Sequence, residues 1–325
     1  MGSRDDRALG VWLGQLSGDA LGSQVEFASS VELQRRYPGG LDTMSASAVW
    51  KTMPGQPTDD SELAIELAMA LIESKPRFDI DRVARHYMRW MQSRPFDAGW
   101  TISQALSGPV DPGQSVSQAI MARANPNSQA NGALMRQSPL AIWGAVRNPH
   151  QAAECARLDA ALTHPHAVCR EASAVFVATL SEIIAHGLTA IDAYQYAIGF
   201  QRRHGREATV LHALEDATDK PPPISVHSGH VVLALHNAFY RILHCHSLKE
   251  VIVASVMLGG DTDTNAAIAG ALAGGIYGAA AIPAEWRQAI DQCKPGVGSA
   301  RPRPERYWPG SYQSLVRGLL NMIES

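Results

Sequence analysis

Most of this chain repeats its apolar residues at the spacing of an α-helix. Leu63, Leu67 and Leu71 recur every four residues, with Ala and Ile on the same face. The same period appears in residues 81–92, 171–185, 191–201, 231–243 and 248–258. Strand signals are scarce, and only residues 251–258 could instead form a buried strand. Since no internal repeat or long linker divides the chain, the pattern predicts a single, mostly α-helical domain.

The composition excludes several classes of protein. Of 325 residues, 46% are hydrophobic, and 28 Lys and Arg against 31 Asp and Glu give a net charge of −3. Because no basic excess is available to neutralise phosphates, binding to a nucleic acid is not expected. The four cysteines are scattered, without a Cys-x-x-Cys pair, which favours reduced thiols over disulfides. We therefore expect a soluble globular protein of the cytoplasm.

No segment has the pattern of a membrane-spanning helix or a targeting sequence. The N-terminus, MGSRDDRALG, is charged and leads into no long apolar stretch, so no signal peptide is expected. Residues 266–284 carry no charge, but they consist mostly of Ala and Gly and include Pro283. Their tendency to insert into a lipid bilayer is therefore weak. A buried helix of small residues is the prediction for this segment.

Two short acidic motifs precede predicted helices. They are Thr58-Asp59-Asp60 and Asp261-Thr262-Asp263-Thr264. Each could cap a helix, because Thr and Asp accept hydrogen bonds from free helix-start amides, and Asp59-x-x-Glu62 resembles a capping box. However, Asp59 and Asp60 cannot both cap one helix. Together the motifs offer four carboxylates and several hydroxyls, a hard-oxygen set without His or Cys that suits Mg²⁺ or Mn²⁺.

Five stretches, in this order along the chain, resemble the motifs of the ADP-ribosylglycohydrolase family. They are residues 14–22 (GQLSGDALG) with Glu26, residues 58–60 (TDD), residues 131–136 (NGALMR), Thr163-His164, and residues 259–265 (GGDTDTN). They span about residues 10–289, and no counterpart is assigned from Lys294 onward. We expect an N-terminal tail at 1–9, an ADP-ribosylglycohydrolase-like all-α domain at 10–293, and a Pro/Arg-rich loop with a C-terminal helix at 294–325 packed on the same domain.

The resemblance implies a single compact multi-helix domain, all-α, with two adjacent divalent cations in a cleft. By position, the metal ligands are Thr58, Asp59, Asp60, Asp261, Asp263 and Thr264. The expected ions are two Mg²⁺ or Mn²⁺. Glu26 matches a glutamate on a mobile loop that can approach the metals. Glu26, Asp60 or Asp97 could take the proton of the attacking water, and the sequence does not choose among them.

The resemblance also implies a site for ADP-ribose. By position, Asp97, Ala98 and Gly99 reach the phosphates and distal ribose, Asn131, Gly132, Ala133 and Met135 line the pocket, and His164 contacts the nucleotide. Other interpretations stay open at three places. Asn131-Gly132 is also an ordinary turn, His164 could be a surface turn residue, and Asp97 could be an exposed acid near Arg94.

Two further patterns point to other chemistry. His244-Cys245-His246 resembles a zinc-binding set, but three adjacent residues rarely face one ion, so a helix end is the better prediction. Asp261-x-Asp263 also resembles the nucleophile motif of haloacid-dehalogenase-type phosphatases. That fold needs a large α/β core after the motif, whereas only 62 residues follow Asp263 (325 − 263). The phosphatase class is therefore excluded.

The function that the resemblance implies is hydrolysis of the glycosidic bond between ADP-ribose and an amino-acid side chain. The substrate would be an ADP-ribosylated protein, and ADP-ribose would be the product. Arginine is the predicted acceptor because Glu26 and Asp97 would border the scissile bond, and a guanidinium pairs bidentately with a carboxylate. The alternatives are a serine-linked ADP-ribosyl hydrolase and a non-catalytic ADP-ribose-binding relative, the latter disfavoured because all six candidate metal ligands are present.

Overall fold

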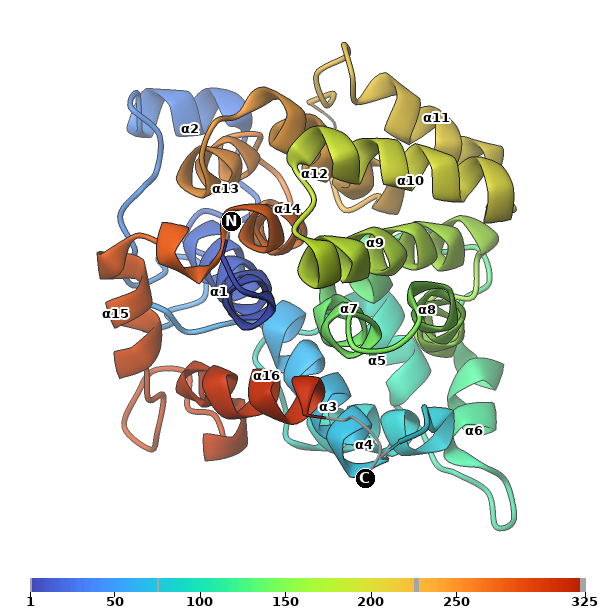
Figure 1. Ribbon diagram of the computed structural model, residues 1–325. Helices are drawn as coiled ribbons and strands as arrows, with labels where there is room; N and C mark the ends of the chain where they lie inside the picture. The colour runs from blue at the N-terminus through green and yellow to red at the C-terminus, as the bar shows by residue number, and fades with distance from the viewer. Residues whose placement is uncertain (1, 75, 225–227, 322–325) are drawn as a thin grey trace.

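The computed structural model describes residues 2–74, 76–224 and 228–321 (Figure 1). Its α-helices are α1 (Arg4–Gly22), α2 (Ser30–Arg36), α3 (Asp59–Glu73), α4 (Ile80–Gln92), α5 (Trp100–Leu106), α6 (Val116–Arg123), α7 (Ser138–Gly144), α8 (Pro149–Thr163), α9 (Ala167–His186), α10 (Ala190–His204), α11 (Ala208–Asp216), α12 (Val231–His244), α13 (Leu248–Val256), α14 (Thr262–Tyr277), α15 (Ala284–Gln292) and α16 (Tyr312–Leu320). Short 3₁₀ helices are η1 (Asn131–Arg136), η2 (Ala279–Ala281), η3 (Glu305–Tyr307) and η4 (Pro309–Ser311). Within these ranges only isolated β-bridges occur, so the all-α prediction is confirmed.

The helix pair α1 and α14 forms the centre of the domain (Figure 1). Glycines on α1 let the two backbones touch, since a Cβ on Gly14 would lie 2.0 Å from the Gly270 carbonyl oxygen and one on Gly18 would lie 2.1 Å from that of Ala266. Nearly all of α14 is buried. Close packing of small residues thus builds a core in a chain with 6% aromatic residues. The predicted buried helix is found for residues 266–275, whereas Ala280, Ala281 and Ala284, after the end of α14, are exposed.

The first helix begins earlier than the sequence analysis expected. Because α1 starts at Arg4, most of the stretch expected to be a tail at residues 1–9 is helical. The Arg7 side chain is buried and donates hydrogen bonds to the carbonyl oxygens of Ile184 (2.9 Å) and Ala185 (3.2 Å) at the end of α9. This contact attaches the start of α1 to the domain and corrects the expected tail.

The Pro/Arg-rich segment before α16 is attached to α3 by buried polar contacts. Arg303 donates two hydrogen bonds to Glu62, from Nε to Oε1 at 2.8 Å and from Nη2 to Oε2 at 2.7 Å. Arg306 and Tyr307 both donate to Glu66, one helical turn further along α3. The segment therefore covers the helix that starts with the first acidic motif. Residues 322–325 of the expected C-terminal part lie outside the described residues.

The structure also decides between the alternative interpretations of several short segments. Residues 248–256 form helix α13, so the strand interpretation of residues 251–258 is wrong. Helix α12 ends at His244, whose Nε2 lies 3.0 Å from the Thr218 carbonyl oxygen, which agrees with a helix end rather than zinc. All four cysteines are free. Among the described residues, no helix combines the length and apolar character needed to cross a bilayer.

Candidate active site

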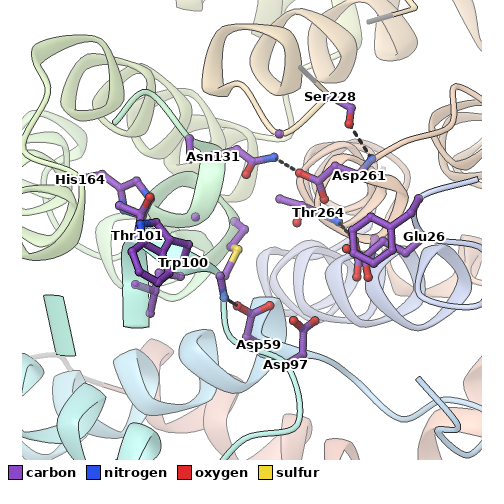
Figure 2. A pocket seen from close by; sticks show the side chains of 18 residues that line it. Glu26, Asp59, Asp97, Trp100, Thr101, Asn131, His164, Ser228, Asp261 and Thr264 are labelled. Carbon is purple, nitrogen blue, oxygen red and sulfur yellow. Dashed lines mark hydrogen bonds between the residues drawn. The ribbon is translucent and has the colours of Figure 1, made fainter. Parts of the chain in front are cut away.

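A cleft with a volume of about 370 Å³ brings together segments from across the chain (Figure 2). It is lined by Glu26, Phe27, Asp59, Asp97, Gly99, Trp100, Thr101, Ile102, Ala130, Asn131, Gly132, Met135, His164, Ser228, Gly229, Asp261, Asp263 and Thr264. Most of the residues that the sequence analysis singled out belong to this lining. The exceptions are Thr58, Asp60, Ala98 and Ala133. The lining also contains Phe27, Trp100, Ser228 and Gly229, which carry no motif that would have identified them.

One end of the cleft is strongly acidic. Single oxygens of Glu26, Asp97 and Asp263 lie within 4.8 Å of one another, and Asp59 and Asp261 line the same end (Figure 2). No Lys or Arg is found among the described lining residues. Sequence reasoning had given Glu26 and Asp97 only a catalytic or substrate role, whereas the geometry groups both with a predicted metal ligand.

The pKa values of these carboxyl groups are raised, first by burial and then by mutual repulsion. Burial and the charge of Asp261 raise the pKa of Glu26 to about 8. The pKa of Asp59 rises to about 7 and that of Asp97 to about 10, and the pKa of Asp263 is also well above its usual range. Like charges held this close are costly without a compensating cation. The all-oxygen donor set fits divalent cations such as Mg²⁺ or Mn²⁺.

Thr58 and Asp60 lie behind the cleft lining. Asp60 is fully buried, and its Oδ1 has no hydrogen-bond partner. The Thr58 hydroxyl lies 3.0 Å from Asp60 Oδ2 and 2.9 Å from Oδ1 of a further acid, Asp19 on α1. An orphaned buried carboxylate oxygen beside the acidic end is a donor that a cation could use.

Asp19 is a residue that sequence reasoning missed, although it lies in the Gly-rich stretch 14–22. It accepts hydrogen bonds from the backbone N–H groups of Thr58 (3.0 Å) and Ser61 (3.1 Å) and lies within reach of both hydroxyls. Burial raises the pKa of Asp19 to about 6, and these hydrogen bonds oppose that rise. Asp19 therefore caps α3 from another helix.

Capping alone does not account for the two acidic motifs. Thr58 and Asp261 occupy the N-cap positions of α3 and α14, but neither side chain makes a capping hydrogen bond. Asp261 Oδ2 instead accepts a hydrogen bond from the Asn131 side chain at 2.7 Å (Figure 2). Glu62, the expected partner in a capping box, accepts from Trp90 and Arg303. Asp263 Oδ1 does accept a hydrogen bond from the Thr264 N–H at 2.9 Å, but Asp59, Asp261 and Asp263 all line the cleft.

The Gly259-Gly260 turn holds the loop of Glu26 against the second motif. Both glycines have positive φ angles, 82° and 76°, and a Cβ on Gly259 would lie 2.5 Å from the Ser30 nitrogen. The Phe27 N–H donates to the Gly260 carbonyl oxygen at 2.8 Å. Glu26 and Asp261 therefore face the same space although they are far apart in the sequence.

The other end of the cleft is neutral and more apolar. Trp100, Thr101 and His164 lie together there, away from Glu26 and Asp97 (Figure 2). Burial and the nearby Arg136 charge lower the pKa of His164 to about 3, so its imidazole is neutral. Its Nδ1 lies 2.8 Å from the Thr163 hydroxyl, while its buried Nε2 has no partner. His164 is buried, which excludes the surface-turn interpretation.

Two further segments of the lining contain residues that the sequence analysis predicted. Asn131 and Gly132 start the 3₁₀ helix η1, and a Cβ on Gly132 would lie 3.0 Å from His164 Cε1 and 3.2 Å from its Nε2, so glycine leaves room for the His164 ring. Asp97 faces the other acids of the cleft, so it is no isolated surface acid. The Gly99 N–H donates to Asp59 at 3.2 Å, which joins the loop of residues 97–99 to the first motif.

The chain is similar to known proteins along most of its length. The sequence model of ADP-ribosylglycohydrolases matches residues 1–309. An ADP-ribosyl-[dinitrogen reductase] glycohydrolase of Rhodospirillum rubrum is 28% identical over 287 residues, which cover 88% of this chain and 90% of that protein. An ADP-ribosylarginine hydrolase of Pseudomonas putida (strain GB-1) is 25% identical over 308 residues, covering 88% of this chain and 74% of that protein.

A solved structure described as an ADP-ribosylglycohydrolase-related protein complex superimposes with a TM-score of 0.77. It is 26% identical in sequence, and the match covers 100% of both chains. The similarity therefore extends over the whole fold as well as over the sequence motifs. This chain belongs to the ADP-ribosylglycohydrolase family.

Proposed function

We propose that this chain hydrolyses the bond between ADP-ribose and an arginine side chain of a modified protein, with two divalent cations, Mg²⁺ or Mn²⁺, in the cleft. Membership of the family supports hydrolysis of an ADP-ribose linkage. The observation that supports the divalent cations and the arginine acceptor is the convergence of Glu26, Asp97 and Asp263 at one end of a cleft whose other end is neutral. The protein is expected to act on the modified protein and to release ADP-ribose.

The two ends of the cleft suit the two halves of ADP-ribose. The carboxylates of Asp59, Asp261 and Asp263 would hold the cations, with Asp60, Thr58 and Thr264 as the further oxygen donors proposed from the sequence. Bound there, divalent cations supply Lewis acidity and lower the pKa of a coordinated water. The neutral end offers the exposed ring of Trp100 and the buried Nε2 of His164 to the adenosine half.

The side chains of this protein would orient the groups of the site and transfer protons. The pKa of Glu26 is raised to about 8 and that of Asp97 to about 10, and cations bound at the aspartates would lower both values. A carboxyl group whose pKa lies near the working pH exchanges a proton readily, so either carboxylate could then take a proton from water at the anomeric carbon. Asn131 orients the Asp261 carboxylate through its 2.7 Å hydrogen bond. Anionic neighbours also favour the oxocarbenium-like transition state of glycosyl transfer.

Arginine is the proposed acceptor because of the surplus of negative charge. With cations bound, Glu26 and Asp97 would be two anions in addition to the aspartates of the two acidic motifs, and both face the acidic end. A guanidinium leaving group keeps its positive charge and pairs with a carboxylate, whereas a seryl oxygen has no such charge. The ADP-ribosylarginine hydrolase of Pseudomonas putida, as a relative, supports the same choice.

The test is release of ADP-ribose from arginine-linked and serine-linked ADP-ribosyl peptides, with and without Mg²⁺. We expect release from the arginine-linked peptide in Mg²⁺ and none in EDTA. Asp263→Ala should abolish turnover, while Asp111→Ala, at an exposed aspartate outside the cleft, should match the wild type. Faster release from the serine-linked peptide would contradict the arginine assignment. Binding of ADP-ribose without any release would identify a non-catalytic binding protein instead.

A further inference from the structure

Phe27, directly after Glu26, combines two features that do not stabilise the folded state. Its φ angle is 68°, in the left-handed region that a bulky side chain rarely adopts. Its side chain is nevertheless 70% exposed, so little burial compensates for the backbone strain. Strained residues persist only where the surrounding structure holds them, and they cluster at functional sites.

The surrounding structure fixes Phe27 at the rim of the acidic end. Its N–H donates to the Gly260 carbonyl oxygen, and the Gly260 N–H donates to the Ala28 carbonyl oxygen, both at 2.8 Å. The edge of its ring contacts Trp50, with centroids 6.3 Å apart and planes at 62°. Trp50 in turn donates a hydrogen bond to Glu26. The ring is thus held in solvent beside the carboxylates.

We propose that Phe27 is the docking contact for the polypeptide segment that carries the modified arginine, an inference that rests on the proposed function. With the anomeric carbon at the carboxylate end, the acceptor side chain would lie beside Glu26 and Phe27, which both line the cleft. An aromatic ring attracts guanidinium groups and packs against their methylene stems. The neighbouring carboxylates favour a cationic segment over an acidic one. A polypeptide places further cationic and methylene groups beside the modified arginine, which a free modified arginine lacks, so Phe27 favours the polypeptide-linked substrate.

The experiment compares kcat/KM on an arginine-linked ADP-ribosyl peptide with kcat/KM on free ADP-ribosylarginine. We expect Phe27→Gly to lower the peptide-to-free ratio about tenfold and Phe27→Tyr, which keeps the ring, to preserve it. The melting temperature of Phe27→Gly should not fall, since glycine adopts this φ without strain. Ile191→Ala, at an exposed apolar residue of α10 outside the cleft lining, should leave the ratio unchanged.

Several outcomes would overturn the inference while leaving the proposed function intact. Equal losses on both substrates in Phe27→Gly would show that the ring supports the cleft rather than the acceptor segment. A melting temperature lower by several degrees would show a structural role. A Phe27→Tyr variant as impaired as Phe27→Gly would exclude recognition by the aromatic ring. A wild-type chain that cleaves neither substrate would contradict the proposed function and this inference together.

Discussion

At the scale of single residues, we predict that the Thr163 hydroxyl sets which nitrogen of His164 carries the proton. Arg136 donates to the Thr163 oxygen at 3.0 Å, and in this prediction the hydroxyl hydrogen points to His164 Nδ1 at 2.8 Å. With Nδ1 as an acceptor in a neutral ring, Nε2 must carry the hydrogen. That N–H is buried without a partner and becomes a donor for a ligand in the cleft.

This arrangement predicts that Thr163→Val weakens ADP-ribose binding about tenfold, or about 1.4 kcal/mol. Valine keeps the shape of threonine but removes the hydroxyl, so Nδ1 loses its donor and the Nε2–H tautomer loses its preference. Thr163→Ser should restore the affinity because it keeps the hydroxyl. Calorimetric titration with ADP-ribose measures the effect, and unchanged affinity in a folded Thr163→Val protein would refute the tautomer assignment.

At the scale of elements, helix α3 depends on an acid from α1. Asp19 accepts the backbone hydrogen bonds of Thr58 and Ser61, which the local sequence of α3 leaves unsatisfied because its N-cap side chain makes none. A helix start buried without such partners is unstable. Since Asp59 and Asp60 are the first two residues of α3, the same hydrogen bonds also position one half of the acidic site.

Asp19→Ala should therefore lower both stability and cation affinity. Losing several buried hydrogen bonds at a helix start is expected to cost roughly 2–4 kcal/mol. The matched control is Asp79→Ala, which removes the exposed N-cap of α4 and should cost about 1 kcal/mol without affecting cation binding. Urea unfolding and Mg²⁺ titration give the two quantities. Equal effects of the two substitutions on Mg²⁺ binding would rule out the positioning role of Asp19.

Several of the helices could be predicted from periodicity and most of the cleft residues from the family resemblance, whereas the contacts between elements could not. Periodicity is a local property, and it identified α3, α4 and α13. The role of Asp19 depends on a hydrogen bond to a residue 39 positions away, which no local pattern encodes. Phe27 was missed for a similar reason, because its positive φ is imposed by the distant Gly260.

At the scale of the whole molecule, the acidic end of the cleft exists only when the fold is complete. Glu26 follows α1, Asp97 precedes α5, and Asp263 lies in the first turn of α14. The contact of α1 with α14 sets the first and last of these side by side (Figure 1). Folding therefore assembles carboxylates that repel one another, and the stability of the whole domain should depend on pH and on cations.

The sign of the pH dependence follows from the raised pKa values. The pKa of Asp59 is about 7 in the folded chain against 3.8 as its ordinary value, so the folded state binds more protons than the unfolded state between these values. The extra proton bound by the folded state contributes its full stabilisation below pH 3.8, and this contribution is lost as the pH rises through 7. Without divalent cations, the melting temperature should therefore be lower at pH 8 than at pH 6.

Divalent cations should reverse this loss, because they bind the deprotonated carboxylates of the folded state only. A ligand at one hundred times its dissociation constant stabilises a protein by about 2.7 kcal/mol. The rise in melting temperature on adding Mg²⁺ should be larger at pH 8 than at pH 6, where protons compete for Glu26 and Asp59. NaCl at matched ionic strength is the control for screening, and Asp263→Ala should lose most of the Mg²⁺ effect. An equal rise with NaCl, or a larger Mg²⁺ effect at pH 6, would show that the carboxylates of the cleft do not form a cation site.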